Sequence, residues 1–344
     1  MTRLAAAAIL VTAMSNAQTY SARKMAVDSM EVVRLADSVH RTEVSIAPSI
    51  GNLAYEMKVN GKNLFWLPCD TLAELAAKPR HAGNPFLAPW ANRLDQDAFW
   101  ANGKKYLLNA GLGNLGRDGN GKPIHGLVTF TSAWQVTRLE SDHRHAEATS
   151  RLEFWRHPEW MAQFPFAHTI KMTYRLQDGA LEVVTRIENH STEPMPVAVG
   201  YHPYLRLHDA PRDQWTVHLA ARDRLVLSKE LIPTGEREPS KFPDPMPLAG
   251  AKLDDVFSRL ERDADGRAEF WVQGKRERIS VIYGPKYTVA VVYAPAGRDF
   301  LCFEPMSAIT NAFNLAHAGL YSELQSIPPG GSWQESYWIK PSGF

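Results

Sequence analysis

The sequence predicts an all-β fold, and three observations support this class. Apolar and polar residues alternate with a period of two along most of the chain, whereas helical periodicity is scarce. The strand-like runs are enriched in β-branched and aromatic residues. Short polar turns separate these runs, which favours a sandwich or a barrel over a fold of alternating strands and helices.

The N-terminal segment has the three-part layout of a secretory signal peptide. Arg3 supplies a positive charge, residues 4–14 are apolar and rich in Ala, and Ser15-Asn16-Ala17 places small residues where a signal peptidase reads. The apolar run is too short to cross a bilayer, and no later stretch is long and apolar enough to do so. We therefore expect residues 1–17 to be a signal peptide and the mature protein to be exported, to the periplasm or out of the cell. The alternative is a fortuitous Ala-rich helix.

Residues 18–344 are expected to form a single β domain. A sandwich or barrel can run to about 250 residues as one unit, and a chain with 44% hydrophobic residues can bury a sizeable core. The sequence contains no interdomain linker and no repeat of fixed period.

Regular signals are few in the first part of this domain. Residues 71–78 predict a short helix that Pro79 ends. Residues 111–122 are rich in Gly and Asn, but no strand-then-helix context surrounds them, which argues against a phosphate-binding loop. Residues 147–154 predict a strand.

The middle of the chain carries the strongest hairpin signal. Residues 171–176 and 181–187 alternate as strands do, and they flank Asp178-Gly179, a dipeptide typical of tight turns. The same alternation predicts strands at residues 215–219 and 335–339.

The later part of the chain predicts one irregular segment and a second hairpin. Residues 231–248 are rich in Pro, and we expect an irregular surface excursion there. Residues 278–283 and 287–293 are strand-like and flank Gly284-Pro285, so they predict a hairpin like the first.

Charge and cysteine content narrow the classes of partner and cofactor. The net charge of +1 gives no electrostatic reason to expect nucleic acid or an anionic membrane as a partner. Cys69 and Cys302 could form a disulfide in an oxidising compartment, but two separate buried thiols are the simpler expectation. The chain has no CxxC or HExxH pattern, and His157 and His168 lack the helical spacing of a paired metal site. We therefore expect no metal and no cofactor.

Four charged or titratable residues stand in apolar runs where alternation would bury them. A single such residue is more often a satisfied core residue than a catalyst. Two of the four precede a Pro at the apparent end of a strand, and the ends of strands project side chains into clefts. The four residues are Arg93 in residues 84–94, His125 in residues 123–127, His202 in residues 197–205 and Glu304 in residues 300–306.

These segments, taken in order, resemble the motifs of the aldose 1-epimerase (mutarotase) family. No single motif is specific, but the ordered set spans most of the mature chain. The motifs are Asn92-Arg93, Ile124-His125-Gly126, Tyr201-His202-Pro203-Tyr204, Leu253-Asp254-Asp255-Val256-Phe257, and Glu304-Pro305-Met306 followed by Asn311-Ala312. The resemblance implies a β-supersandwich of the galactose mutarotase-like kind, with the site in the concave face of its large sheet.

The resemblance also implies roles for individual residues. Glu304 is expected to be the general base and His202 the general acid. Arg93, His125 and Asp254 are expected to bind and orient the sugar. We choose Asp254 rather than Asp255 because it keeps the spacing to Phe257. Trp90, Tyr204 and Trp271 are aromatic residues that could stack on a sugar or pack in the core.

The implied function is interconversion of the α and β anomers of a free aldose by acid–base ring opening and closure. One acid and one base, on different sides of the ring in a pocket wide enough for one monosaccharide, suffice for this chemistry without a metal, cofactor or covalent intermediate. The expected partner is a monosaccharide, and the expected assembly is a monomer or weak dimer.

Three other functions stay open from the sequence. A glycoside hydrolase would use paired carboxylates, for which Asp254 and Glu304 are candidates. A non-catalytic carbohydrate-binding or accessory domain would not require both His202 and Glu304. A hexose-6-phosphate 1-epimerase would need additional Arg or Lys near C6 of the sugar, and the predicted export disfavours it.

Overall fold

A computed structural model describes residues 19–344, so the predicted signal peptide lies outside the described residues. About half of the chain, 48%, is in strands, and the only α-helices among the described residues are three short ones. The all-β prediction is therefore confirmed. None of these helices combines the length and apolar character needed to cross a membrane. The α-helices are α1 (Leu72–Ala77), α2 (Pro158–Met161) and α3 (Ala312–His317).

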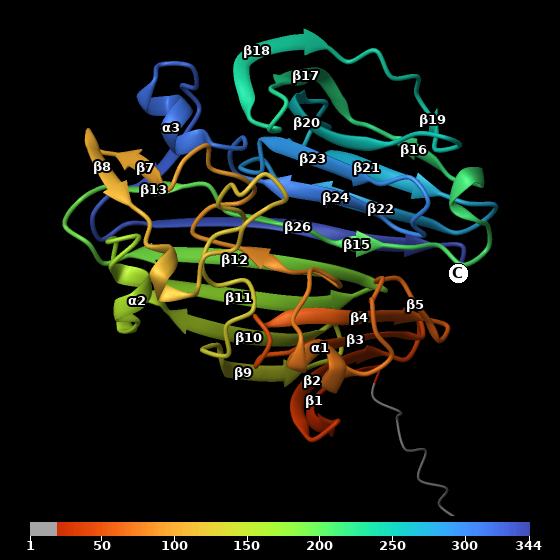
Figure 1. Cartoon of the computed structure of the whole chain (residues 1–344). Helices are drawn as coiled ribbons and strands as arrows, with labels where there is room; N and C mark the ends of the chain where they lie inside the picture. Colours follow the sequence, from red (N-terminus) through yellow and green to blue (C-terminus); the bar gives the residue numbers. More distant parts are fainter. Residues whose placement is uncertain (1–18) are drawn as a thin grey trace, which may run out of the picture.

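The largest sheet has nine strands and runs through the whole molecule (Figure 1). Its neighbouring strands are antiparallel throughout. In spatial order they are β19 (Met246–Pro247), β16 (Thr216–His218), β21 (Ala268–Gln273), β22 (Arg278–Tyr283), β26 (Ser332–Ser342), β12 (Ala180–Asn189), β11 (His168–Gln177), β10 (Ala146–Glu153) and β9 (Gln135–Ser141).

A second sheet of eight strands lies in the upper half of Figure 1. Its strands are β18 (Pro233–Pro239), β17 (Ala221–Leu227), β20 (Leu253–Leu260), β23 (Val289–Ala294), β24 (Leu301–Met306), β14 (Gly200–Tyr201) and β6 (Phe86–Leu87), with β15 (Tyr204–Leu205) paired to β24.

The N-terminal residues form a five-stranded sheet at the bottom of Figure 1. It contains β1 (Tyr20–Val27), β2 (Met30–Asp37), β3 (Thr42–Ala47), β4 (Leu53–Val59) and β5 (Lys62–Asn63). The short pairs β7 (Ala98–Ala101) with β8 (Lys104–Leu107) and β13 (Met195–Val197) with β25 (Gln325–Ile327) complete the strands.

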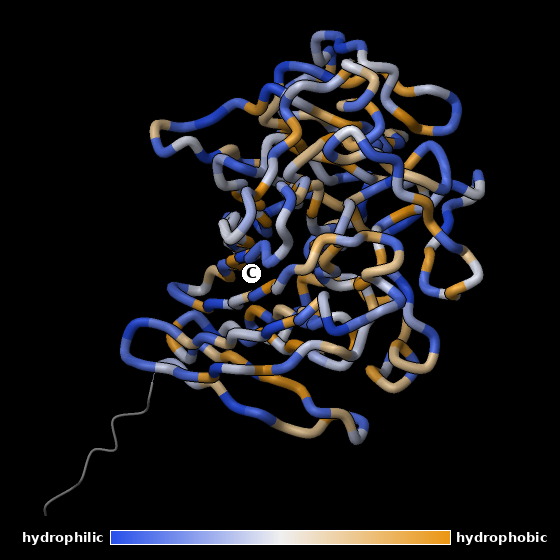
Figure 2. The backbone as a smooth tube through the Cα atoms, turned by 90° about the vertical axis from the view of Figure 1, so that its left-hand side faces the viewer, coloured by the Kyte–Doolittle hydropathy of each residue, from blue (hydrophilic) through white to orange (hydrophobic). Residues whose placement is uncertain are grey.

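The nine-stranded sheet packs against a different sheet at each end. Near β21 and β22, the ring of Phe270 lies 5.9 Å from that of Phe303 on β24, which joins the nine-stranded and eight-stranded sheets. Near β11, the buried Tyr174 donates a hydrogen bond of 2.8 Å to the backbone oxygen of Asn52, which joins the nine-stranded and five-stranded sheets. Figure 2 shows hydrophilic and hydrophobic residues interspersed along the described backbone, as expected for sheets with one buried face.

The first predicted hairpin is confirmed. Strands β11 and β12 pair antiparallel, and Gln177 lies opposite Ala180 across the turn. Asp178 and Gly179 both have positive φ, 51° and 71°. These values fit the Asp-Gly turn that matches the twist of the two strands.

The second predicted hairpin is wrong, although both of its strands exist. Strand β22 pairs with β21 and β26, whereas β23 pairs with β20 and β24 in the other sheet. The turn after β22 leads the chain from one sheet to the other, with the Gly284 N–H bonded to the Ser336 oxygen at 3.0 Å and the Tyr287 N–H bonded to the Gly284 oxygen at 3.1 Å. The turn signal did not specify the partners of these strands: β22 pairs with β21, the strand before it in the chain, and β23 pairs with β24, the strand after it.

Two other local predictions have mixed outcomes. The helix at residues 71–78 is confirmed as α1, and Thr71 caps it by accepting a bond from the Glu74 N–H at 3.2 Å. The irregular excursion at residues 231–248 is partly wrong, because it contains β18 and the short β19. Strand β18 is at the edge of its sheet with Pro at both ends, a position that tolerates the missing N–H.

The two cysteines are separate free thiols, as expected. Cys302 is fully buried on β24, and burial raises the pKa of its thiol well above the ordinary value. Cys69 is only half-buried, so the expectation of two buried thiols is wrong for this residue.

Candidate active site

The register of the eight-stranded sheet brings distant polar residues onto one face. Tyr293 on β23 lies opposite both Asp254 on β20 and Cys302 on β24, and Tyr204 on β15 also lies opposite Cys302. Residues directly opposite one another share a face, and so do residues two apart along a strand. Glu304 follows Cys302 by two positions and therefore joins this face. Phe303 between them points the other way, toward the nine-stranded sheet. The face thus belongs to the eight-stranded sheet rather than to the largest one, where the site was expected.

Glu304 lies inside β24, not at its end as its position before Pro305 suggested. Pro305 continues the strand opposite Ala290 of β23. Gly200 of β14 is opposite Met306, and Tyr204 of β15 is opposite Cys302. His202, midway between β14 and β15, therefore comes into register with Glu304.

His202 and Glu304 are in direct contact. His202 Nε2 lies 3.2 Å from Glu304 Oε1, and the two residues are 6% and 1% exposed. The His202 N–H donates to the Pro85 oxygen at 3.1 Å, which holds the segment between β14 and β15 in place. The acid and base candidates therefore lie side by side, which differs from the expected arrangement on two sides of a sugar ring.

Burial shifts both members of this pair toward their neutral forms. Desolvation raises the pKa of the Glu304 carboxyl well above its ordinary value; the negative charge of Asp254 adds to this, and Arg93 opposes it. Desolvation lowers the pKa of His202 well below its ordinary value, assisted by His81. Within residues 19–344, the buried atoms Glu304 Oε2 and His202 Nδ1 have no hydrogen-bond partner. Such atoms are rare and mark a place where a ligand can supply the partner.

Arg93 connects two carboxylates at this site. Its Nε donates to Asp118 Oδ2 at 2.7 Å, and one terminal nitrogen lies 3.8 Å from Asp254 Oδ2. Its other terminal nitrogen donates to Asn92 Oδ1 at 3.1 Å. Sequence reasoning missed Asp118, because a single acid in a Gly- and Asn-rich loop carries no signal of a distant arginine.

The structure separates the two neighbouring aspartates of β20. Asp254 lies on the side of Arg93 and is half-buried, and desolvation raises its pKa, against the effect of Arg93. Asp255 instead accepts a bond of 2.9 Å from Arg224. The choice of Asp254 therefore agrees with the alternation of side chains along the strand.

His125 is held in an unusual backbone conformation with φ of 64°. The Asn92 N–H donates to His125 Nδ1 at 3.3 Å, so the proton of the neutral ring is on Nε2. Burial lowers the pKa of His125 well below its ordinary value. The next residue, Gly126, also has positive φ, and a Cβ there would lie 2.0 Å from the Ala88 oxygen, so only Gly fits beside this histidine.

His81 is a third imidazole at the site that sequence reasoning missed. Its ring centre lies 4.8 Å from that of His125 and 6.2 Å from that of His202. Desolvation lowers its pKa to about 4, so the ring is neutral at neutral pH. It follows α1 in a short irregular segment, and no motif or periodicity there distinguishes it from a surface loop residue.

Aromatic rings adjoin the pair on its other side. Tyr204 stacks on His202 with ring centres 4.6 Å apart, and a small cluster of Tyr204, Phe300 and Cys302 packs against the partly exposed Trp66 and Tyr293. The other two aromatic candidates lie elsewhere. Trp90 is fully buried in the main core, and Trp271 stacks on His218 on the nine-stranded sheet.

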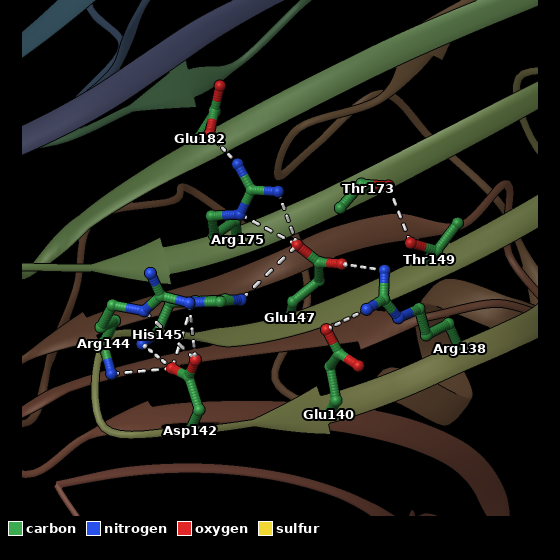
Figure 3. Close-up of polar contacts among 10 residues, drawn as sticks. All are labelled: Arg138, Glu140, Asp142, Arg144, His145, Glu147, Thr149, Thr173, Arg175 and Glu182. Carbon is green, nitrogen blue, oxygen red and sulfur yellow. Dashed lines mark hydrogen bonds and ion pairs between the residues drawn. The ribbon is translucent and has the colours of Figure 1, made fainter.

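A second polar cluster lies on β9, β10 and β11, away from these residues (Figure 3). Glu140, His145 and Glu147 form the only group of three potential metal ligands within 4.8 Å of one another among residues 19–344. Two arginines already occupy the carboxylate of Glu147: Arg138 lies 3.4 Å from Oε1, and Arg175 lies 2.7 Å from Oε2. These two arginines already neutralise the Glu147 carboxylate that a metal ion would need as a ligand, so we assign no metal to this cluster.

Comparisons with known proteins place this fold and site in context. A family model described as aldose 1-epimerase matches residues 32–340. A galactose mutarotase-like protein from Clostridium acetobutylicum has a TM-score of 0.84 at 20% identity, over 95% of this chain and 99% of that one. A protein from Synechocystis sp. PCC 6803 has a TM-score of 0.73 at 25% identity, over 93% and 98%. Galactose 1-epimerase from Lactobacillus acidophilus NCFM has a TM-score of 0.71 at 14% identity, over 94% and 99%.

The structural similarity confirms the galactose mutarotase-like β-supersandwich fold. The family match extends over most of the chain and includes all five residues that the motifs singled out, Arg93, His125, His202, Asp254 and Glu304. The chain therefore belongs to the aldose 1-epimerase family, which supports a general epimerase or mutarotase function.

Proposed function

We propose that this protein is a mutarotase that interconverts the α and β anomers of a free aldose by acid–base catalysis. The observation that carries the proposal is the contact of 3.2 Å between His202 Nε2 and Glu304 Oε1. Ring opening needs a base for the C1 hydroxyl and an acid for the ring oxygen. Both oxygens are bonded to C1, so an acid and a base that are neighbours can reach them together.

Ring opening moves one proton in each direction between the sugar and the pair. The Glu304 carboxylate takes the proton of the C1 hydroxyl, and the His202 imidazolium gives its proton to the ring oxygen. The C1–O5 bond breaks with its electron pair on O5, and C1 becomes an aldehyde. Rotation about C1–C2 presents the other face of the aldehyde, and the reverse transfers close the ring as the other anomer.

Burial favours the product side of the first half-reaction. After ring opening the pair is a carboxylic acid beside a neutral imidazole, and this is the form that desolvation stabilises at both Glu304 and His202. The open-chain aldehyde is the less stable form of the sugar. The environment of the pair therefore offsets part of the uphill step. The reverse transfers on ring closure regenerate the carboxylate and the imidazolium, and a hydroxyl that donates to Glu304 Oε2 would stabilise that carboxylate.

The surrounding residues can hold a sugar by complementary hydrogen bonds. Arg93 only donates, and Asp254 in its charged form only accepts, so together they match the two sides of a hydroxyl. His125 donates through Nε2, because Asn92 occupies its Nδ1. We assign substrate binding to Arg93, Asp254 and His125 and place His81 beside them.

Polarimetry of the purified protein with freshly dissolved α-aldoses tests the proposal. We expect faster loss of optical rotation with at least one sugar and no release of new reducing ends from oligosaccharides. Glu304→Gln should abolish most of this acceleration while sugar binding, measured by calorimetry, persists. Release of reducing ends would indicate a glycoside hydrolase. Sugar binding without acceleration by the wild type would indicate a carbohydrate-binding domain.

We also propose export after removal of residues 1–17, and a single domain that acts as a monomer or weak dimer. The basis for export is the charged, apolar and small-residue layout of the N-terminus. The intact mass of the protein recovered from the periplasm or medium tests the cleavage site, and sedimentation tests the assembly. A full-length cytoplasmic product would contradict export.

A further inference from the structure

A cavity of about 560 Å³ adjoins the candidate active site. It shares His81 and His125 with the site, but His202 and Glu304 do not line it. Residues 113–117, 124–127 and 129–131 form most of its wall, together with Trp160. Its volume falls in the range of about 300–1,000 Å³ that is usual for small-molecule sites. The hollow therefore begins at the two histidines and provides space beyond the acid–base pair.

The orientation of one amide in the wall follows from its partners. The Asn109 N–H donates to Gln163 Oε1 at 3.1 Å, so the other end of that side chain is the donor Nε2. Gln163 Nε2 donates to Asn114 Oδ1 at 2.7 Å. Asn114 therefore keeps its oxygen on Gln163 and has its NH₂ group left to donate.

Two buried polar atoms of the wall have no hydrogen-bond partner within residues 19–344. They are Asn114 Nδ2 and His81 Nε2. Leaving a buried donor without an acceptor is unfavourable, and a ligand that supplies hydroxyl oxygens removes this cost. The wall also has apolar surfaces, because Phe130 and Trp160 line it.

The charges of the wall do not favour an anionic ligand, because Glu159 is its one acidic side chain and lies 3.5 Å from His157 Nδ1. Arg117 is its one Lys or Arg side chain. Both terminal nitrogens of Arg117 bond Asp97, at 2.9 and 2.8 Å, and one also donates to the Gly121 oxygen at 2.7 Å. The imidazoles of His81 and His125 are neutral, because burial lowers their pKa values. A phosphate group would find no unpaired cation there.

We propose that this cavity is a subsite for a second sugar residue, so that the preferred substrate is the reducing-end aldose of a disaccharide. The inference rests on the proposed function. The reacting ring contacts His202 and Glu304 through C1 and its ring oxygen. A sugar attached to one of its other hydroxyls extends past His125 into the cavity, where Asn114 Nδ2 donates to one of its hydroxyls.

The test compares kcat/KM for mutarotation of lactose, maltose and cellobiose with that of glucose and galactose. We expect at least one disaccharide to exceed its own reducing-end monosaccharide by about tenfold, the worth of roughly one hydrogen bond. Asn114→Leu should remove this advantage and leave monosaccharide turnover unchanged, which also shows that the variant is folded. Asn120→Leu is the matched control, because Asn120 is exposed and does not line the cavity.

If Asn114→Leu lowers the turnover of both monosaccharides and disaccharides, Leu115→Trp serves as the test variant instead. Leu115 lines the same cavity, and the larger indole ring would fill part of it. Equal kcat/KM for disaccharides and monosaccharides in the wild type would overturn the inference, as would a disaccharide advantage that neither variant reduces. Preference for a hexose 6-phosphate over both would also overturn it. In each of these cases a monosaccharide is still turned over, whereas failure of the proposed function is the absence of acceleration with every sugar.

Discussion

Two regions of this protein gather a buried carboxylate, histidine and arginine on a sheet, and they treat the carboxylate differently. On β10, Glu147 is 3% exposed, and arginines on β9 and β11 approach both of its oxygens (Figure 3). On β24, Glu304 is 1% exposed, and its one hydrogen-bonding or ionic partner within residues 19–344 is His202, at one oxygen. Arg93, whose positive charge acts to lower the pKa of Glu304, is bonded to Asp118 instead.

The difference separates a structural cluster from a reactive one. A buried carboxylate between guanidinium groups stays charged and holds strands together. A buried carboxylate beside a neutral imidazole is held close to its neutral form, so its proton can be exchanged with a bound molecule. Composition alone does not distinguish the two clusters, because both contain Glu, His and Arg. The number of cations in contact with the carboxylate does.

The largest expected effect is on activity. Glu304→Gln should reduce mutarotation by about 10²–10⁴-fold, since it removes the base without changing the size of the side chain. Glu147→Gln should leave kcat/KM within about twofold of wild type, because the ionic partners of Glu147 are Arg138, Arg175 and His145 rather than residues of the candidate active site. Polarimetry on both variants measures the contrast. Equal losses in the two variants would remove the distinction between the clusters.

The pH dependence of activity sharpens the same contrast. Because the pKa of Glu304 is raised and that of His202 is lowered, the pair keeps a single exchangeable proton over a range between two apparent pKa values. We expect kcat/KM to be highest in this range and to fall on the alkaline side as the pair loses that proton. His202→Asn should lower the rate by about 10²-fold or more and abolish this bell shape. A variant with an unchanged profile would assign the acid to another residue.

Asp254 and Asp255 test the comparison within one strand. Asp254→Asn should lower kcat/KM by about 10–100-fold, the worth of one hydrogen bond to a charged group. Asp255→Asn should have little effect on activity, because its partner is Arg224 rather than a residue of the site. Steady-state kinetics on the two variants decides between them, and a larger loss for Asp255→Asn would reverse the assignment.

Stability should respond in the opposite sense to activity. Glu147→Gln removes the charge that Arg138 and Arg175 share, and we expect a loss of about 1–2 kcal/mol in the free energy of unfolding. This expected loss of stability is small for a buried carboxylate, because the Arg138 side chain is 60% exposed and solvent screens its charge. Glu304→Gln should leave stability unchanged or raise it, since no buried charge is lost. Urea unfolding measures both; a greater loss for Glu304→Gln would contradict this account.

The last expected effects are on the pH dependence of stability. Desolvation lowers the folded-state pKa of His81 and His168 to about 4 from 6.5. The stability that they contribute is present above pH 6.5 and is lost as pH falls toward 4, with a slope of about 1.4 kcal/mol per pH unit for each residue. Glu304 has the opposite sign: its contribution is present below its ordinary pKa and is lost as pH rises through its raised pKa. His168→Gln should reduce the acid slope by about one proton, and an unchanged slope would show that another group titrates.

Much of the fold was predictable from local patterns. The hairpin at Asp178-Gly179 and the helix capped by Thr71 depend on residues that are close in the chain, and both are confirmed. The failures concerned which strands pair with one another. The strands on the two sides of Gly284, β22 and β23, belong to two different sheets, and the Pro-rich segment contains β18, which pairs with β17 as an edge strand.

The candidate site divides in the same way. Polar residues in apolar runs marked Arg93, His125, His202 and Glu304, because burial of such residues needs a partner or a ligand. The sequence did not single out His81 and Asp118, because each lies in an irregular or Gly-rich loop. The path of such a loop is set by the rest of the fold. Their part in the site is visible only from the ring contact with His125 and the bond to Arg93.

By itself, the sequence determined the all-β class, the local turns and which residues could not be buried without a partner. These properties follow from alternation and residue chemistry over a few positions. Only the tertiary structure decided that His202 touches Glu304, that Asp254 rather than Asp255 faces Arg93, and that a cavity opens beside His125. Each of these depends on the register between strands or loops that are far apart in the chain, and a shift of one residue would turn every side chain to the opposite face.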